Sequence, residues 1–330
     1  MQPQRNDYDI TNRIQTTDPL AVEAEVSRLL RLLYPGATHV AMSSAFADVT
    51  ALYAGNFPGY RACDTAYHDL QHVMDVTLAM ARLMDGYERT RTQTPALGVK
   101  LFQFGVTVAL FHDMGYLRKL DDDVAPNGAF YTLNHVSRGA TFLCGYFKSL
   151  DLPELAEAGA ELIHFTGYEK RVADILIEDP VLRMLGSLLG SADIMAQMAD
   201  RCYLEKCRDR LYPEFVAGGI AERRDAEGNK TVVFASGDDL INKTPVFFQT
   251  AVDRLEADLG GAYNYAASHF GGFNLYIHAA TKNIRFAKQI AVGSAPSLRR
   301  TPPPQFDSEA VGVDGALDTN RTCDLPLRRG

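Results

Sequence analysis

Apolar residues recur every three or four positions through most of the chain, and this spacing restricts its fold more than any other feature. One face of the segment 73–84 carries Val73, Val76, Met80, Leu83 and Met84. Polar caps and prolines mark where helices are expected to begin, namely at Asp64 or Thr65, Thr94-Pro95, Pro153, Asp179-Pro180 and Thr244-Pro245. The pattern predicts an all-α fold, arranged as a helical bundle.

Three segments depart from this pattern. Glu227-Gly228-Asn229, followed by the β-branched and aromatic run 231–234, predicts one small β-hairpin. Residues 1–18 are polar and are expected to form a flexible segment. Residues 294–330, with three consecutive prolines and a glycine-rich acidic stretch, are expected to be a disordered tail. The chain should therefore fold as one helical domain over 19–293.

Charge and composition exclude several classes of protein. The net charge is -8 and no basic block is present, which argues against a duplex nucleic-acid binder and against attraction to anionic membranes. The five cysteines include no Cys-x-x-Cys pair, so neither a disulfide framework nor a thiolate zinc site is expected. No apolar run reaches the length of a membrane span, and the first residues lack the apolar core of a signal peptide. We expect a cytoplasmic protein whose partner is a small molecule.

Histidines and aspartates form an ordered series along the helical region. His68 and His72 are four residues apart, which would place both rings on one face of a helix. His112 and Asp113 are adjacent at the end of an apolar helix and precede Gly115. Because adjacent side chains point in different directions, such a pair can hold one metal ion only at a helix end or a bend.

Three further residues complete the series. His135 lies near the start of one helix, His164 near the end of the next, and Asp193 inside an apolar helix. A buried carboxylate is costly unless it is paired or bound to a metal, and a single histidine on an apolar face is more often a core residue than a ligand. The whole series nevertheless indicates a metal site with the ligands His72, His112, Asp113, His135, His164 and Asp193. Imidazole and carboxylate ligands suit Zn, Fe, Mn or Ni, and carboxylate with water also suits Mg.

At this point the residues resemble a known family. His72, then His112-Asp113, then Asp193 resembles the metal-binding quartet of HD-domain phosphohydrolases. The segment from Tyr67 through His68 and His72 to Asp75-Val76 is similar to the first signature of cyclic nucleotide phosphodiesterases. The resemblance extends over roughly residues 60–290 in the order of motifs.

The resemblance implies an HD-domain helical bundle that hydrolyses a phosphoester, with a cyclic nucleotide among the candidate substrates. It implies two divalent metal ions (Mn, Mg, Fe, Ni or Zn) bridged by Asp113, with His68 as the general acid. Asp75 would accept a hydrogen bond from the ring nitrogen of a ligand histidine that does not bind the metal. Arg138, beside His135, is the candidate for holding a phosphate, and Gln249 is the candidate for contacting a nucleobase.

The sequence also departs from the phosphodiesterase pattern. Tyr116 stands where those enzymes have a further histidine, so specificity for cyclic AMP or cyclic GMP does not follow. His135 and His164 match a six-ligand pattern shared with cyclic-di-GMP-type phosphodiesterases and with mixed-valent di-iron oxygenases that act on a polyol or a phosphonate. Such an oxygenase is one alternative, and a non-catalytic regulatory domain is another. His68, one turn before a ligand, favours hydrolysis.

Overall fold

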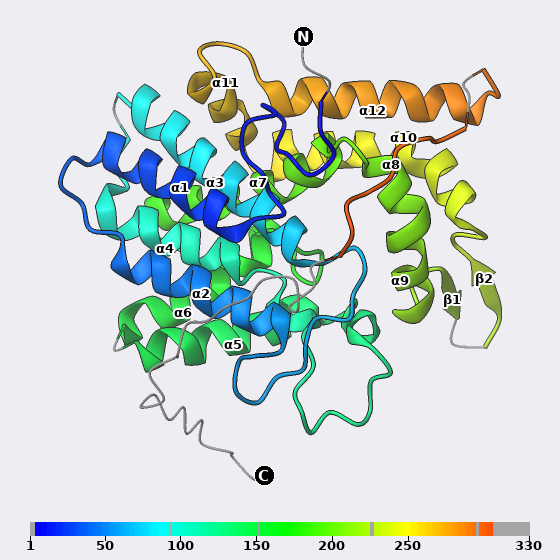
Figure 1. Ribbon diagram of the computed structural model, residues 1–330, viewed down its shortest axis with the longest axis horizontal. Helices are drawn as coiled ribbons and strands as arrows, with labels where there is room; N and C mark the ends of the chain where they lie inside the picture. Colours follow the sequence, from blue (N-terminus) through cyan, green and yellow to red (C-terminus); the bar gives the residue numbers. More distant parts are fainter. Residues whose placement is uncertain (1–3, 93, 151, 225–227, 295–296, 306–330) are drawn as a thin grey trace.

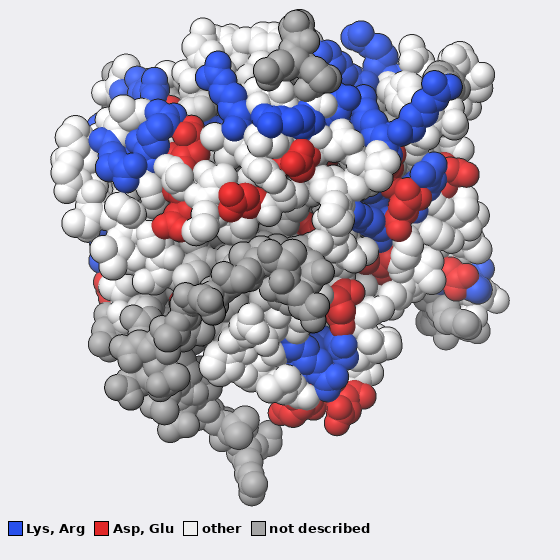
Figure 2. Space-filling view, viewed as in Figure 1, with Lys and Arg blue, Asp and Glu red and all other residues white. Residues whose placement is uncertain are grey.

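The computed structural model describes residues 4–92, 94–150, 152–224, 228–294 and 297–305. It is predominantly helical, with a single two-stranded sheet in the described part of the chain, which confirms the all-α class (Figure 1). Among these residues, no helix is both long enough and apolar enough to cross a membrane. On the face shown in Figure 2, basic and acidic side chains lie interspersed.

Helix α3 (Leu70–Thr90) lies at the centre of the domain. It packs against α1 (Pro19–Leu33), α4 (Gly98–Leu110), α7 (Pro180–Ala199) and α11 (Tyr265–His269). Its apolar stripe is fully buried, as is that of α7, because both helices are covered on several sides. Burying each large apolar side chain of such a stripe stabilises the fold by about 1.5–3 kcal/mol.

Further helices surround this centre. The helix α2 (Val40–Ala54) packs on α4, and α5 (His135–Ser149) packs on α6 (Pro153–Leu162). The helix α12 (Leu275–Ala291) lies across α7 and α10 (Gly237–Asp253), along the upper edge of Figure 1. Two short helices, α8 (Tyr203–Lys206) and α9 (Tyr212–Ala217), lead to the sheet. Together, α9, the sheet and part of α10 form one end of the molecule (Figure 1).

The predicted β-hairpin is confirmed. Strand β1 (Glu222–Arg224) pairs antiparallel with β2 (Lys230–Val232), and Arg223 is opposite Thr231. The turn includes Gly228, which has a φ of 86°. Glycine adopts this left-handed conformation without strain, as tight hairpin turns require.

Two of the predicted helix starts are confirmed and three are wrong. Pro153 opens α6, and the side chain of Asp179 accepts from the first backbone amides of α7. Asp69, rather than Asp64 or Thr65, caps α3, and α4 begins at Gly98 rather than at Pro95. Ser236 caps α10, so Pro245 lies inside that helix. A proline interrupts one backbone hydrogen bond there, but the upstream cap and the buried helix face outweigh that loss.

Both ends of the described chain contact the helical body. Residues 4–18, expected to be flexible, pack against it, because Asp9 is 4% exposed and accepts from Arg82 Nη2 at 2.5 Å. Residues 297–305 also lie along the body, where the backbone amide of Arg300 donates to Glu205 and the amide of Gln305 donates to the carbonyl of Thr65. The remainder of the predicted tail, 306–330, lies outside the described residues.

Candidate metal centre and adjoining cavity

The ends of α3 and α4 and the middle of α7 bring four predicted ligands together. His72 Nε2 lies 3.2 Å from Asp113 Oδ2 and 3.5 Å from Asp193 Oδ1. His112 Nε2 lies 3.2 Å from the same Asp113 oxygen and 4.0 Å from Asp193 Oδ1. The side chains of His72, His112 and Asp113 are buried, and their ligand atoms lie within 4.8 Å of one another. These three residues could therefore hold one metal ion.

Local backbone structure explains how adjacent residues share one site. The helix α4 ends at Leu110, and a 3₁₀ turn over Met114–Tyr116 follows. The bend lets the adjacent side chains of His112 and Asp113 turn toward one site, with His112 Nε2 3.2 Å from Asp113 Oδ2. Gly115 allows the next helix to approach, because a Cβ at this position would lie 1.7 Å from the carbonyl oxygen of His135.

The hydrogen bonds of the two rings suit metal ligation. His112 Nδ1 donates to the carbonyl oxygen of Ala109 at 2.8 Å, and His135 Nδ1 donates to the carbonyl oxygen of Thr132 at 2.8 Å. Because a carbonyl oxygen can only accept, each Nδ1 carries the proton and each neutral ring has its lone pair on Nε2. His112 Nε2 lies 3.4 Å from His72 Nε2, so a cation beside the two nitrogens could bind both rings once His72 has lost its proton.

The charges around the cluster also favour a cation. Burial lowers the pKa of His72, but hydrogen bonds to Asp113 and Asp193 outweigh it and raise the pKa to about 10. Burial likewise opposes the charged form of Asp113, yet the attraction of His112 and His72 holds the pKa of Asp113 well below its usual range. Two carboxylates thus draw positive charge to a buried position, which is the environment a metal ion occupies in proteins.

His135 approaches the other oxygen of Asp113. Its Nε2 lies 3.8 Å from Asp113 Oδ1, whereas His72 and His112 face Oδ2. Burial lowers the pKa of His135, which favours the neutral ring that a ligand needs. The two oxygens of Asp113 therefore face histidines on two sides.

His164 has no ion pair with the cluster among the described residues. Its ring is buried and makes no hydrogen bond or ion pair with Asp113 or Asp193, and Nδ1 has no hydrogen-bond partner among the described residues. Burial and the nearby Lys170 lower the pKa of His164. Ion-pair contacts join five of the six predicted ligands, and the ligand role of His164 stays a prediction.

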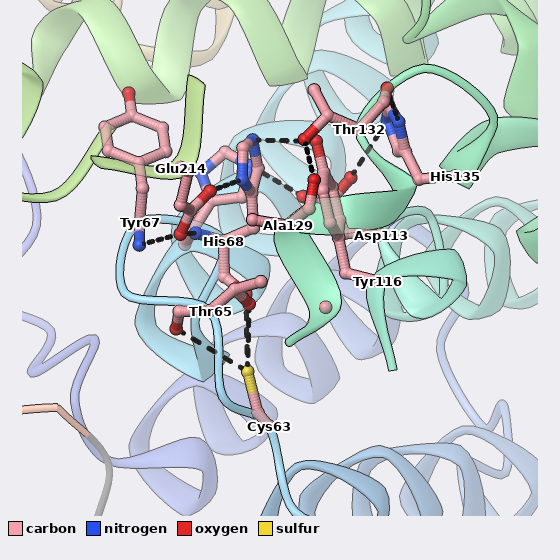
Figure 3. A network of polar contacts seen from close by, with 12 residues as sticks. Cys63, Thr65, Tyr67, His68, Asp113, Tyr116, Ala129, Thr132, His135 and Glu214 are labelled. Atoms are coloured by element: carbon pink, nitrogen blue, oxygen red, sulfur yellow. Dashed lines mark hydrogen bonds and ion pairs between the residues drawn. The ribbon is translucent and has the colours of Figure 1, made fainter. Parts of the chain in front are cut away.

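A hydrogen-bonded pair lies beside the cluster in Figure 3. His68 Nδ1 donates to Glu214 Oε2 at 2.5 Å, and the other oxygen of Glu214 accepts from the backbone amide of Tyr67 at 2.5 Å. The Tyr116 ring stacks between His68 and His135, with ring centroids 4.2 and 4.4 Å apart. Glu214 lies on α9, far along the chain, and its only sequence signal is a single acidic residue between Tyr212-Pro213 and Phe215-Val216.

Two of the predicted supporting residues are engaged elsewhere. Arg138 donates to the carbonyl oxygens of Gly115 at 2.9 Å and Leu117 at 3.1 Å, so it fixes the turn after Asp113 and does not face a phosphate. Its guanidinium also covers the Tyr131 ring at 3.5 Å. Asp75 lies near Lys206 and makes no hydrogen bond with a ligand histidine, and burial raises the pKa of Asp75 to about 7.

The third predicted supporting residue lies away from the site. Gln249 is exposed on α10, outside the lining of the cavity beside the cluster, and its amide donates to Asp253 at 2.9 Å. This intrahelical contact is an ordinary i,i+4 pair. The described structure therefore gives no support to the prediction that Gln249 contacts a nucleobase.

A cavity of about 510 Å³ opens beside the cluster. His68, His72, Asp113, His135 and Asp193 lie in its wall, together with Tyr67 and Tyr116. The opposite wall comes from α9, the hairpin region and α10, and its residues include Phe215, Ile220, Phe234, Leu240 and Phe247. This volume is within the range of pockets that bind small molecules.

Comparison with protein-family models, with curated proteins and with solved structures gave no match. The geometry of the metal cluster and of the adjoining cavity is therefore the basis for proposing a function.

Proposed function

We propose that this protein is a metal-dependent phosphohydrolase of the HD-domain type, which cleaves a phosphoester. One observation supports the proposal most strongly: His72, Asp113 and Asp193 of the metal cluster line the same cavity as His68, whose ring is held by Glu214. A cation site and a positioned proton donor are the two components that cleavage of a phosphoester needs.

His72, His112, Asp113 and Asp193 would hold a divalent cation, with Mn, Mg, Fe, Ni and Zn as candidates. When bound, the cation would supply positive charge for the phosphoryl oxygens and would make a coordinated water more acidic. His135, which faces the second oxygen of Asp113, would contribute to a second ion. We therefore propose two metal ions.

His68 would protonate the leaving group. Glu214 accepts from Nδ1, so it fixes the ring orientation and leaves Nε2 toward the cavity. In the reaction, the oxygen of a water molecule bonds to phosphorus and the bond from phosphorus to the leaving oxygen breaks. That oxygen takes a proton from Nε2 of protonated His68, and the proton of the attacking water is lost to solvent. The products are an alcohol and a phosphate.

One observation favours hydrolysis over the oxygenase hypothesis. Hydrolysis uses a proton donor, and the His68–Glu214 pair has the geometry of one.

Metal analysis combined with hydrolysis tests the proposal. The purified protein would be loaded with each candidate metal, its metal content measured, and its activity followed on bis(4-nitrophenyl) phosphate. His112→Ala and Asp113→Asn should lose metal and activity. His39→Ala is the matched control, since His39 lies at the start of α2 and makes no side-chain cap contact.

Two results would contradict the proposal. A stoichiometric iron pair with substrate-dependent oxygen uptake after anaerobic purification would establish the oxygenase alternative. Unchanged function of His112→Ala in cells would favour a regulatory domain instead.

A further inference from the structure

We propose that the cavity receives the apolar organic group of a phosphoester, and not a nucleoside or a polyol. The inference rests on the proposed function and adds the substrate class. It follows from the side chains that form the cavity wall away from the metal cluster.

That distal wall is built from aliphatic and aromatic side chains. Phe215 and Phe234 stack with ring centroids 5.6 Å apart, and Ile220, Leu240 and Phe247 adjoin them. A ligand group enclosed by such side chains loses its contacts with water and gains few polar contacts in return. Apolar groups are favoured there and hydroxyl-bearing groups are disfavoured.

The threonine hydroxyls in the wall already donate to backbone carbonyls. Thr132 donates to Ala129 at 2.6 Å. Thr166 and Thr244 donate to the carbonyl oxygens of Ile163 at 2.8 Å and Leu240 at 2.9 Å. A polyol or a nucleobase needs hydrogen-bond donors and acceptors around it. These three hydroxyl groups already donate to the backbone, so they cannot also donate to the ligand.

Several other polar side chains line the cavity, and some of them already have partners. Glu169 accepts from the backbone amides of Val136 at 2.8 Å and Ser137 at 3.1 Å. Lys243 Nζ donates to the carbonyl oxygen of Val233 at 2.7 Å and to Asp239 at 2.8 Å, so a carboxylate already balances its charge. Tyr67 donates to Gln197 Oε1 at 3.4 Å, which leaves the Gln197 NH₂ group as a donor toward the cavity. Arg223 is exposed on β1, at the rim of the cavity. The Gln197 amide and the Arg223 guanidinium can contact an ester oxygen, but these donors do not match both the donors and the acceptors on the edge of a base.

Apolar surface continues out of the cavity mouth. Leu133, Tyr168 and Phe247 line the cavity, and they are 67%, 64% and 41% exposed. Large apolar side chains clustered at the rim of a pocket mark a surface that an apolar ligand covers. The organic group should therefore be extended, with one end at the metal cluster and the other at this rim.

Calorimetry with non-hydrolysable phosphonates tests the inference through binding alone. The wild-type protein, in the presence of the metal that it retains, would be titrated with methyl-, hexyl- and decylphosphonate and with a phosphonate analogue of adenosine monophosphate. Affinity should rise by about fourfold for each methylene buried until the cavity is filled. The nucleoside phosphonate should bind more weakly than decylphosphonate. Affinity that is independent of chain length, or tighter binding of the nucleoside analogue, would overturn the inference.

A pair of phenylalanine variants locates the effect. Phe247→Ala should weaken decylphosphonate binding by about tenfold and methylphosphonate binding much less, because only the long chain reaches that wall. Phe273→Ala is the matched control, since Phe273 is 54% exposed and outside the cavity lining. An equal loss for both ligands in Phe247→Ala, or the same loss in Phe273→Ala, would contradict the placement.

The two proposals fail differently. Absence of metal and of hydrolysis for every ester would defeat the phosphohydrolase proposal, while chain-length dependence would still establish an apolar occupant. Hydrolysis of esters without that dependence would overturn the substrate class alone.

Discussion

Replacing Glu214 by glutamine tests the role of the buried pair beside the metal cluster. The substitution keeps the shape of the side chain and its acceptor for the Tyr67 amide. It removes the carboxylate that accepts from His68 Nδ1 at 2.5 Å, with both side chains largely buried. A hydrogen bond to a charged group contributes about 1.5–3 kcal/mol. If His68 needs this bond to donate its proton, the rate should fall by about 10-fold to 150-fold.

The assay compares two phosphodiesters that share one organic group and differ in the leaving group. An alkoxide leaving group needs protonation, whereas 4-nitrophenolate departs readily without it. The loss in Glu214→Gln should therefore be about 10-fold to 150-fold for the alkoxide and less than about threefold for 4-nitrophenolate. Metal content should stay at the wild-type value, since the ion pair of Glu214 is with His68, which lies beside the metal cluster and is not one of its ligands.

A control substitution, Glu256→Gln, and the comparison of the two leaving groups test this prediction. Glu256→Gln changes an exposed glutamate that accepts from Tyr263, far from the cavity lining, and should leave both rates unchanged. Equal losses for the two leaving groups in Glu214→Gln would show that Glu214 only maintains structure. The assignment of His68 as proton donor would then be refuted.

The remaining predictions concern stability and the geometry of the cluster. Asp9→Asn removes the carboxylate that balances the charge of buried Arg82, which among the described residues keeps only its hydrogen bond to Tyr276, and should lower the free energy of unfolding by about 3–5 kcal/mol in urea denaturation. Burial opposes ionisation of Asp9, but Arg82 and backbone amides outweigh it, so the pKa of Asp9 lies below its ordinary value of 3.8. The stabilisation is fully present above about pH 4 and lost below it, so the difference between variant and wild type should shrink in acid; a constant difference would contradict this. Gly115→Ala places a Cβ against the backbone of His135 and should reduce metal content more than Gly36→Ala, where a Cβ meets nothing within 4 Å. Wild-type metal content in Gly115→Ala would contradict the packing described.

The helical architecture followed from local patterns in the sequence. The spacing of Val73, Val76 and Met80 predicts the buried face of α3, and Asp179-Pro180 predicts the start of α7, because both signals operate within a few residues. Helix starts that depend on longer contacts were wrong. Pro245 lies inside α10 because Ser236 caps the helix upstream, and a proline with an adjacent threonine does not reveal that alternative.

Local sequence signals predicted the metal-binding part of the candidate site but not the contacts between distant parts of the chain. His72, His112 and Asp113 come from two helix ends, and their residue types and order identify them before their distances are known. Glu214 was missed, because its contact with His68 joins residues far apart in the chain and no spacing rule connects them. The charge of Arg138 and its position beside His135 predict a contact with phosphate. In the structure its guanidinium instead donates to backbone carbonyl oxygens that are close in the fold.

The central claim is that His72, His112 and Asp113 bind a metal ion. Crystals grown with Mn²⁺ and measured at a wavelength with strong anomalous scattering would locate it. We expect an anomalous peak in contact with His72 Nε2, His112 Nε2 and an oxygen of Asp113. Crystals containing Mn²⁺ with no peak at these atoms, or with peaks only elsewhere on the molecule, would contradict the claim.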